Sequence, residues 1–181
     1  MAEQCNERKQ CRINGTIFEN QSIKYIKKMK KLLLVLLLAV GSFATVQAQE
    51  IKWMSLDEAL AAQKKKPKPI FMDVYTDWCG PCKMLDKNTF QTKEVSEYIS
   101  KNYYAVKFNA EGNSEVTYKG KKYTNPKFDP SRKGRNGVHD FTMFLKVQGY
   151  PSMYILDAKG EVKSPIVGYH TPEQLLPLIK A

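Results

Sequence analysis

The chain has 181 residues, of which 29 are lysine or arginine and 18 are aspartate or glutamate, so its formal net charge is +11. A hydrophobic fraction of 43%, with ten glycines and nine prolines, is ordinary for a globular protein and excludes a collagen-like or wholly disordered chain. The charge is compatible with an anionic partner, and the four cysteines are compatible with two disulfides, a zinc site or a redox pair. The positions of the charged residues and cysteines in the chain distinguish these alternatives.

The first quarter of the chain contains the three parts of a secretory signal peptide. Within residues 29–48, a short basic start precedes an apolar run, and small residues follow up to Ala48. Even when it is extended over residues 32–46, the run has 15 residues, whereas a membrane-spanning helix needs about 18 or more. We therefore expect cleavage after Ala48 and export to the periplasm. The alternative is a chain anchored by residues 32–46 that faces the periplasm.

Residues 1–28 precede this signal and are polar, without a periodic apolar face. We interpret them as a mis-assigned translation start, with Met29 as the first residue; a genuine cytoplasmic extension is the alternative. Without residues 1–48, the chain keeps 21 basic and 15 acidic residues, a net charge of +6, and two of its four cysteines. Residues 49–181 have the size of one domain, and their cysteine pair would meet oxidising conditions after export.

The mature region begins with a short apolar segment, residues 51–53, which we predict to be a strand. A helix is predicted for residues 56–65, because Ser55 and Glu58 have the spacing of a capping box. Pro67 ends this helix, since proline cannot continue the hydrogen-bond pattern.

The next strand contains one acidic residue among apolar ones. Residues 69–76 are mostly apolar and β-prone, which indicates a strand covered on both faces. Asp73 within it either lies at a solvated edge or is buried with a raised pKa. A helical stretch follows through residue 101, with a break near residues 88–92, and residues 103–109 are predicted to form another strand.

Residues 111–137 interrupt the alternation of strands and helices. They are rich in lysine, glycine, asparagine and proline, and residues 116–118 and 123–124 flank a turn sequence that predicts a small hairpin. Seven basic and three acidic residues give this insertion a net charge of +4. It is either a solvated basic loop or a surface that recognises client proteins, and it emerges either beside the active-site rim or at the opposite end of the sheet.

The C-terminal part completes an α/β pattern. A helix is predicted for residues 138–147, and two short strands are predicted for residues 152–156 and 162–167. The last helix begins after Thr171, and Pro177 should distort or shorten it. Strands that alternate with helices and end in a hairpin imply a mixed sheet with helices on both faces.

The segment between the second strand and its helix reads Trp78-Cys79-Gly80-Pro81-Cys82-Lys83. It resembles the active-site sequence of the thioredoxin superfamily. The buried acid, strand lysine, cis-proline segment and late glycine of that family are matched in order by Asp73, Lys107, residues 149–152 and Gly168. The resemblance implies a thioredoxin fold, which is a central mixed β-sheet flanked by helices, with the insertion placed before the third helix.

The cysteine pair has the chemistry of thiol–disulfide exchange. A thiolate is the attacking species, and a free cysteine, with a pKa of about 8.5, is mostly protonated at neutral pH. Cys79 at a helix start would face unpaired N–H groups and the positive end of the helix dipole, which lowers that pKa and makes Cys79 the nucleophile. Cys82, one turn further on and facing inward, would resolve the mixed disulfide. Pro81 supplies a fixed φ at the helix start.

Cys82 has to lose a proton before it can act, and Asp73 is the candidate base. Burial would raise the pKa of Asp73 into the working range, and Lys107 would partly offset the cost of its charged form. The alternatives are a solvated edge carboxylate for Asp73 and an exposed strand lysine for Lys107.

A substrate-binding surface is predicted around the pair. By the resemblance, a cis bond before Pro151 exposes the backbone of Tyr150 to an extended substrate segment. The family often has a small or β-branched residue in place of Tyr150, which leaves the redox potential and the substrate preference open. Trp78 would form an apolar rim beside the pair, unless it serves only in packing, and Gly80 and Pro81 complete the surface.

A zinc site, haem attachment and nucleic-acid binding agree less well with the sequence than a redox pair does. A structural zinc site needs four ligands, but His139 and His170 lie far from the cysteines without ligand spacing, so we expect no metal and no cofactor. Both histidines are expected at the surface or in packing. Haem attachment would need a histidine directly after Cys82. We expect no nucleic acid partner, since the protein is predicted to be exported and the insertion carries no binding motif.

We therefore predict an exported, monomeric thiol–disulfide oxidoreductase that acts on disulfide-bearing protein substrates through Cys79 and Cys82. The Gly-Pro dipeptide between the cysteines resembles that of reducing thioredoxins more than that of strong oxidants. Reductase or interchange activity is thus expected, with electrons from a membrane donor. The alternative is a thioredoxin-fold chaperone or binding module whose disulfide is structural.

Overall fold

The computed structural model describes residues 25, 27–30 and 50–180 of the chain. The predicted signal peptide, the alternative anchor and the translation-start segment fall mostly outside these residues. Within the described part, no helix is long and apolar enough to cross a membrane. The elements of residues 50–180 are α2 (Leu56–Lys65), β1 (Ile70–Tyr75), α3 (Gly80–Leu85), the π-helix η1 (Asp86–Phe90), α4 (Lys93–Asn102), β2 (Tyr104–Asn109), β3 (Val116–Tyr118), β4 (Lys121–Tyr123), α5 (Asp140–Phe144), β5 (Ser152–Leu156), β6 (Ile166–Val167) and α6 (Pro172–Lys180).

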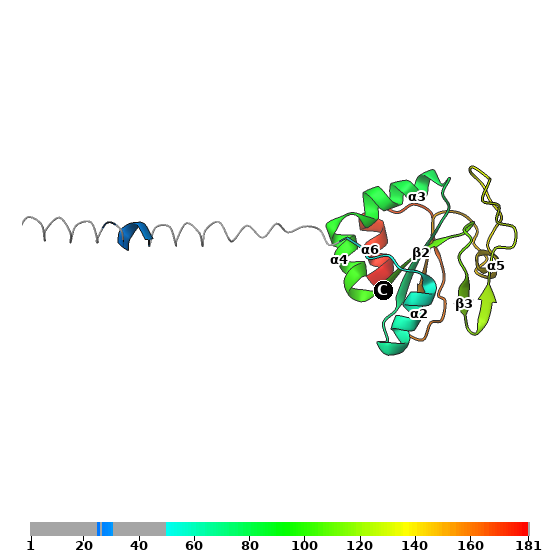
Figure 1. Ribbon diagram of the computed structural model, residues 1–181, viewed down its shortest axis with the longest axis horizontal. Helices are drawn as coiled ribbons and strands as arrows, with labels where there is room; N and C mark the ends of the chain where they lie inside the picture. Colours follow the sequence, from blue (N-terminus) through cyan, green and yellow to red (C-terminus); the bar gives the residue numbers. More distant parts are fainter. Residues whose placement is uncertain (1–24, 26, 31–49, 181) are drawn as a thin grey trace, which may run out of the picture. The chain divides into compact units, whose positions relative to one another are not determined.

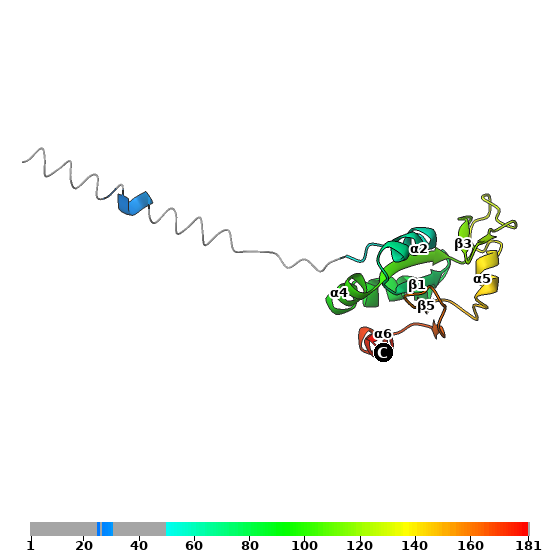
Figure 2. The same cartoon turned by 90° about the horizontal axis from the view of Figure 1, so that it is seen from below.

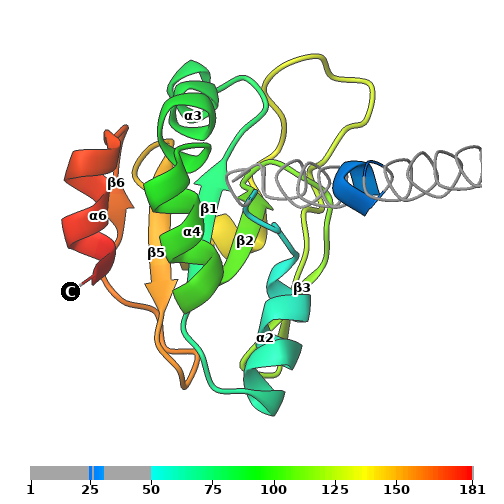
Figure 3. The same cartoon turned by 90° about the vertical axis from the view of Figure 1, so that its left-hand side faces the viewer.

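The central sheet has four strands in the order β2-β1-β5-β6, which Figure 3 shows side by side. Strand β1 runs parallel to β2 and antiparallel to β5, so the sheet is mixed, as predicted. In this register Asp73 of β1 lies opposite Lys107 of β2 and, on the other side, opposite Met153 of β5. The pairing of β1 with β2 therefore sets a lysine beside the strand's one acidic residue.

Helices cover both faces of the sheet, because side chains alternate along each strand. Ile70 packs with Leu56 of α2 and Phe141 of α5 in one core cluster. Phe71 belongs to the other cluster, which contains residues of α3, α4 and α6. Figure 2 shows α2 and α6 on opposite sides of β1 and β5. Asp73 is two residues after Phe71 and so faces the side of α3, the helix that begins with the cysteine pair.

The ends of two helices follow from local chemistry. Helix α2 starts with the predicted capping box, in which Ser55 and Glu58 exchange hydrogen bonds. Helix α6 contains Pro177 but is not shortened by it, because the helix continues to residue 180. Leu175 and Ile179 of α6 are buried in the core, so their burial offsets the one hydrogen bond that the proline cannot donate.

The predicted strand at residues 51–53 is wrong. Only Met54 pairs with the sheet, in a single parallel bridge to Val106. Ile51 and Trp53 instead pack in the hydrophobic cluster that contains residues of α3, α4 and α6. This segment therefore covers the sheet and is not one of its strands. The interruption that was expected near residues 88–92 is present, since η1 ends at residue 90 and α4 begins at residue 93.

Two C-terminal elements are shorter than predicted. The helix expected over residues 138–147 is confined to α5, because Lys146 adopts a φ of 54° that no helix accommodates. The strand expected over residues 162–167 keeps only β6 and an isolated bridge at Val162. Pro165 lies between them and has no N–H to donate to a ladder.

The insertion consists of a hairpin and a long loop. Strands β3 and β4 are antiparallel, and both turn residues, 119–120, have the positive φ that a tight hairpin turn requires. Tyr118 and Tyr123 pack edge-on against Phe141, with ring centroids 5.6 and 5.2 Å apart, so the hairpin covers α5. Residues 126–137, called the arm below, form the yellow loop that Figure 1 shows at the same end of the sheet as α3. The insertion therefore emerges beside the cysteine pair.

Candidate active site

Cys79 and Cys82 form a disulfide with an S–S distance of 2.06 Å. Cys79 is the N-cap residue of α3, and its Sγ accepts a hydrogen bond from the backbone N–H of Cys82 at 3.1 Å. Each cysteine is only 2% exposed, whereas Gly80 and Pro81 between them are exposed. The structure thus places the pair at a helix start, as predicted, and directs a backbone N–H at the sulfur of Cys79.

Asp73 is buried on the side of the sheet that faces α3, with 1% of its surface exposed. Burial raises its pKa to about 6, although the positive charge of Lys107 acts in the opposite direction. Lys107 Nζ lies 3.0 Å from Asp73 Oδ2. This contact is an ion pair, and beyond it neither carboxylate oxygen has a polar partner within the described residues. The alternative of a solvated edge carboxylate is wrong.

Lys107 lies between two carboxylates. Besides its contact with Asp73, its ammonium donates a hydrogen bond to Asp86. Burial lowers the pKa of Lys107, but the two carboxylates more than offset this effect, so the pKa is raised. The Nζ also lies 4.9, 5.2 and 5.8 Å from the ring centroids of Tyr75, Trp53 and Phe90. With 20% of its side chain exposed, Lys107 is not the exposed strand lysine of the alternative reading.

Asp86 is a member of this group that the sequence analysis missed. It follows Cys82 by four residues at the end of α3, so the two residues share one face of the helix. That spacing is the signal that could have identified it. A cavity of about 390 Å³ opens beside Asp86 and Lys107 and is also lined by Trp53 and Phe90. The ion pair around the buried acid therefore borders a recess that solvent can enter.

Trp78 and Tyr150 form one rim of the site, with their rings edge to face and their centroids 5.9 Å apart. The peptide bond between Tyr150 and Pro151 is cis, as predicted. The carbonyl oxygen of Pro151 accepts a hydrogen bond from the N–H of Gly168 at 2.8 Å, which ties this loop to the end of β6. Trp78 is half-buried, so part of its ring is available at the surface.

Two further residues, Glu111 and Arg135, contact Trp78 from the insertion. The indole Nε1–H donates to Glu111 Oε2 at 2.8 Å, and the same oxygen accepts the N–H of Asn136 at 2.7 Å. The guanidinium of Arg135 lies 4.2 Å from the centroid of the Trp78 ring. Sequence reasoning missed both residues, because no local pattern shows where a 27-residue insertion returns to the domain.

His139 is a packing residue rather than a ligand. It is fully buried, caps α5 by accepting the Phe141 N–H at Nδ1, and contacts the Ser114 carbonyl through Nε2 at 2.6 Å. Its ring packs edge-on against Phe108. Within the described residues, no group of three or more histidine, cysteine or acidic side chains could hold a metal ion.

The family model described as "Thioredoxin-like domain" matches residues 56–181. Among curated proteins, the thiol:disulfide interchange protein DsbD of Vibrio cholerae is 42% identical over 45 residues, which are 25% of this chain and 8% of DsbD. Chloroplastic thioredoxin Y of Oryza sativa subsp. japonica is 35% identical over 71 residues, 39% of each chain. The chain thus aligns with well under half the length of these relatives.

Solved structures resemble the chain over more of its length. A candidate disulphide-isomerase from Bacteroides thetaiotaomicron is 26% identical with a TM-score of 0.51, over 74% of this chain and 93% of the other. A thioredoxin from Thermus thermophilus has a TM-score of 0.54 at 13% identity, over 72% of this chain and 85% of the other. At that identity the second likeness concerns the fold alone, and it agrees with the mixed sheet and flanking helices described above.

Proposed function

The chain belongs to the thioredoxin-like domain family and is a thiol–disulfide oxidoreductase, and from this premise we propose that it reduces or interchanges disulfides of exported proteins. The observation that carries the proposal is the Cys79–Cys82 disulfide at the start of α3, with the carboxylate of Asp73 buried on the side of the sheet that α3 covers. A structural disulfide in a binding module would have no need of such a buried acid.

The proposed reaction is two successive exchanges. In the reduced protein, the Cys79 thiolate attacks a substrate disulfide, forms a mixed disulfide and releases one substrate sulfur as a thiolate, which takes up a proton. The Cys82 thiolate then attacks the sulfur of Cys79 and releases the second substrate thiol. Two electrons pass from the cysteine pair to the substrate, and the protein is left with the disulfide seen in this structure.

Each exchange uses one neighbouring group. The backbone N–H directed at the Cys79 sulfur stabilises the thiolate that attacks. Asp73, with a pKa of about 6, is mostly ionised at neutral pH and accepts the proton of Cys82 before the second exchange. Lys107 holds this carboxylate in place as its ion-pair partner, with Nζ 3.0 Å from Asp73 Oδ2.

The substrate would bind over the exposed edge of the pair. Gly80 and Pro81 are exposed there, and the rings of Trp78 and Tyr150 stand beside them. We propose that an extended substrate segment lies on this surface and along the backbone before Pro151.

The proposed direction is reduction rather than strong oxidation, as the Gly-Pro dipeptide between the cysteines suggests. An exported reductase works against an oxidising compartment and has to be reduced again from outside that compartment, which favours a membrane electron donor. The similarity to the DsbD interchange protein over 45 residues supports this class of chemistry. Export itself and a monomeric state are part of the proposal.

An insulin-reduction assay with dithiothreitol tests the activity. We expect turnover by the full chain and its loss in Cys79→Ser, because the attacking sulfur is removed. The matched control replaces Cys5 and Cys11 by serine, which removes another cysteine pair and should leave turnover unchanged. Wild-type protein without turnover would favour the binding-module alternative.

Equilibration with glutathione buffers tests the direction. We expect a reduction potential closer to the value of about −270 mV for thioredoxin than to about −120 mV for the strong oxidant DsbA. A value near the second would contradict the reductase assignment while leaving the exchange chemistry intact.

A further inference from the structure

The arm, residues 126–137, brings a positive charge to the rim of the redox site. Arg135 is exposed, and its guanidinium lies 4.2 Å from the centroid of the Trp78 ring. Trp78 is the residue directly before Cys79 in the chain. Stacking on an indole face is favourable for a guanidinium and leaves its in-plane N–H donors directed outward.

The arm is held in place at its base by a buried asparagine. The side chain of Asn125, 9% exposed, donates to the carbonyl oxygens of Gly112 and Gly137 at 3.0 and 2.6 Å. Gly137 passes so close to the backbone of Lys127 that an added Cβ would lie 2.4 Å from the Lys127 oxygen. The two ends of the arm are therefore joined to each other and to the chain after β2.

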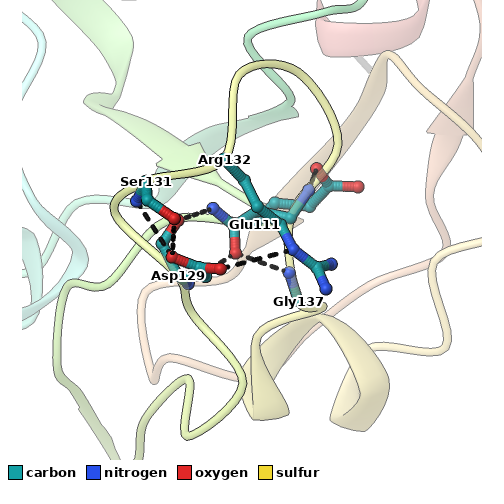
Figure 4. A network of polar contacts seen from close by, with 6 residues as sticks. Glu111, Asp129, Ser131, Arg132 and Gly137 are labelled. Carbon is teal, nitrogen blue, oxygen red and sulfur yellow. Dashed lines mark hydrogen bonds and ion pairs between the residues drawn. The ribbon is translucent and has the colours of Figure 1, made fainter.

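Inside the arm, a network of polar contacts fixes its course (Figure 4). The side chain of Asn136 accepts the N–H of Asp129 and donates to the Asp129 carbonyl, at 2.8 and 2.7 Å. The Asn136 backbone N–H donates to the buried carboxylate of Glu111. With the N–H of Gly137, which also donates to its side chain, Asn136 makes four hydrogen bonds. These bonds fix the backbone beside Arg135, so its position next to Trp78 is set before any partner binds.

The basic side chains of the arm differ in whether they already form an ion pair with an acidic residue. Arg132 is paired with Asp129 at 3.6 Å. Arg135 and Lys133 are exposed and form no ion pair within residues 50–180. Asp77, the acidic residue directly before Trp78 in the chain, is exposed and accepts a hydrogen bond from Asn109 at 3.0 Å. The donors of Arg135 are therefore available to a group from another molecule.

We propose that Arg135 is a specificity-determining residue, which favours disulfide-bearing protein segments that carry a carboxylate beside the reactive cysteine. The inference rests on the proposed function and names the class of substrate it prefers. A guanidinium binds a carboxylate through two parallel hydrogen bonds. Because Arg135 is stacked on Trp78 and its backbone is fixed, little conformational freedom remains to be lost on binding.

The test uses three synthetic peptides with the same intramolecular disulfide, flanked by glutamate, glutamine or lysine. Reduced full-length protein is mixed with each peptide, and peptide reduction is followed by chromatography to give a second-order rate constant. At low salt we expect the glutamate peptide to react about 10-fold faster than the lysine peptide, with the glutamine peptide between them. The preference should weaken as salt screens the charges.

Two substitutions separate Arg135 from the overall charge of the protein. Arg135→Gln should bring the rates for the glutamate and lysine peptides to within about twofold of each other, and Arg135→Glu should reverse their order. The matched control, Lys159→Glu, makes the same charge change in the exposed turn after β5, at the other end of the sheet, and should keep the preference.

Three results would overturn the proposal. Equal wild-type rates for all three peptides would remove the preference itself. A preference that survives Arg135→Glu would assign it to other charges, and an equal loss with all three peptides in both variants would reduce Arg135 to a support for Trp78. By contrast, no reduction of any peptide by the wild-type protein would contradict the proposed function rather than the preference.

Discussion

Two buried carboxylates, Asp73 of β1 and Glu111 of the insertion, differ in the polar groups that they contact. Glu111, 8% exposed, accepts hydrogen bonds from the indole of Trp78 and the backbone of Asn136. Asp73, 1% exposed, is paired with Lys107 and has no other polar partner within the described residues. A buried acid with its hydrogen bonds made holds structure together, whereas one without them is poised to take up a proton.

The difference follows from what each carboxylate faces. Glu111 meets two N–H groups, and each donates a hydrogen bond to its carboxylate. Asp73 meets a lysine ammonium that is shared with Asp86, so part of its burial penalty is not offset and its pKa rises to about 6. Substitutions at the two acids and at Asp86 test this contrast.

The largest effect should be the pH dependence of stability that Asp73 causes. Its pKa is about 6 in the folded protein against 3.8 for a free aspartate, so between these values the folded chain binds a proton that the unfolded chain does not. Stability from this group is therefore lost as pH rises from about 4 through 6, by about 3 kcal/mol in total. Denaturant unfolding at pH 4, 6 and 8 measures it.

Asp73→Asn is the matched control, since it keeps the shape and removes the ionisation. The free energy of unfolding of Asp73→Asn relative to wild type should rise by about 2.4 kcal/mol between pH 4 and pH 8. A difference that is constant with pH would mean that Asp73 is not poised near neutrality.

The second effect concerns turnover. Asp73→Asn should slow insulin reduction at pH 7 by about 100-fold, equivalent to about 2.7 kcal/mol, because Cys82 loses its proton acceptor. The deficit should shrink as pH approaches about 8.5, where a free thiol ionises without help. Steady-state rates from pH 6 to 9 measure it.

Glu111→Gln distinguishes the two acids in the same assay. It keeps an oxygen for both N–H donors, so we expect turnover to fall no more than about threefold, with an unchanged pH profile. An equal loss in Glu111→Gln and Asp73→Asn would show that the contrast in hydrogen bonding has no catalytic meaning.

The two acids also differ in how far the sequence could predict them. Asp73 is one acidic residue in an apolar strand, six residues before Cys79; that pattern predicts the strand and leaves Asp73 either buried or at a solvated edge, and the structure shows it buried. The contact of Glu111 with Trp78 spans 33 residues and depends on where the insertion returns to the domain. Such a contact is decided by tertiary packing, on which no local propensity bears.

Elements were predicted well where local chemistry decides and less well where a single residue intervenes. The capping box of α2 and the hairpin turn of the insertion have their signals within four residues. Helix α5 ends early at a positive φ of Lys146, a residue without a known preference for that conformation. Ile51 and Trp53 are apolar enough for a strand but are used to cover the sheet.

The third effect is on the stability that Glu111 provides. Glu111→Leu removes the acceptor and leaves the N–H groups of Trp78 and Asn136 without a partner, so we expect a loss of about 2 kcal/mol. In contrast to the contribution of Asp73, this loss should be the same at pH 6 and pH 8. Denaturant unfolding at both values measures it, and a loss that changes between them would contradict the assignment of Glu111 as a structural acid.

The smallest effect should come from Asp86, which is partly exposed and shares Lys107 with Asp73. Its negative charge raises the pKa of Asp73, so Asp86→Asn should lower that pKa and leave more of the base ionised at pH 6. We expect turnover about twofold higher at pH 6 and unchanged at pH 8, where Asp73 is ionised in either protein. Glu97→Gln on α4 removes the same charge from an exposed pair with Lys93 and should leave the profile in place. A shift of the acid limb to higher pH in Asp86→Asn would contradict this prediction. It would mean that Asp86 lowers the pKa of Asp73, chiefly by holding Lys107 against it.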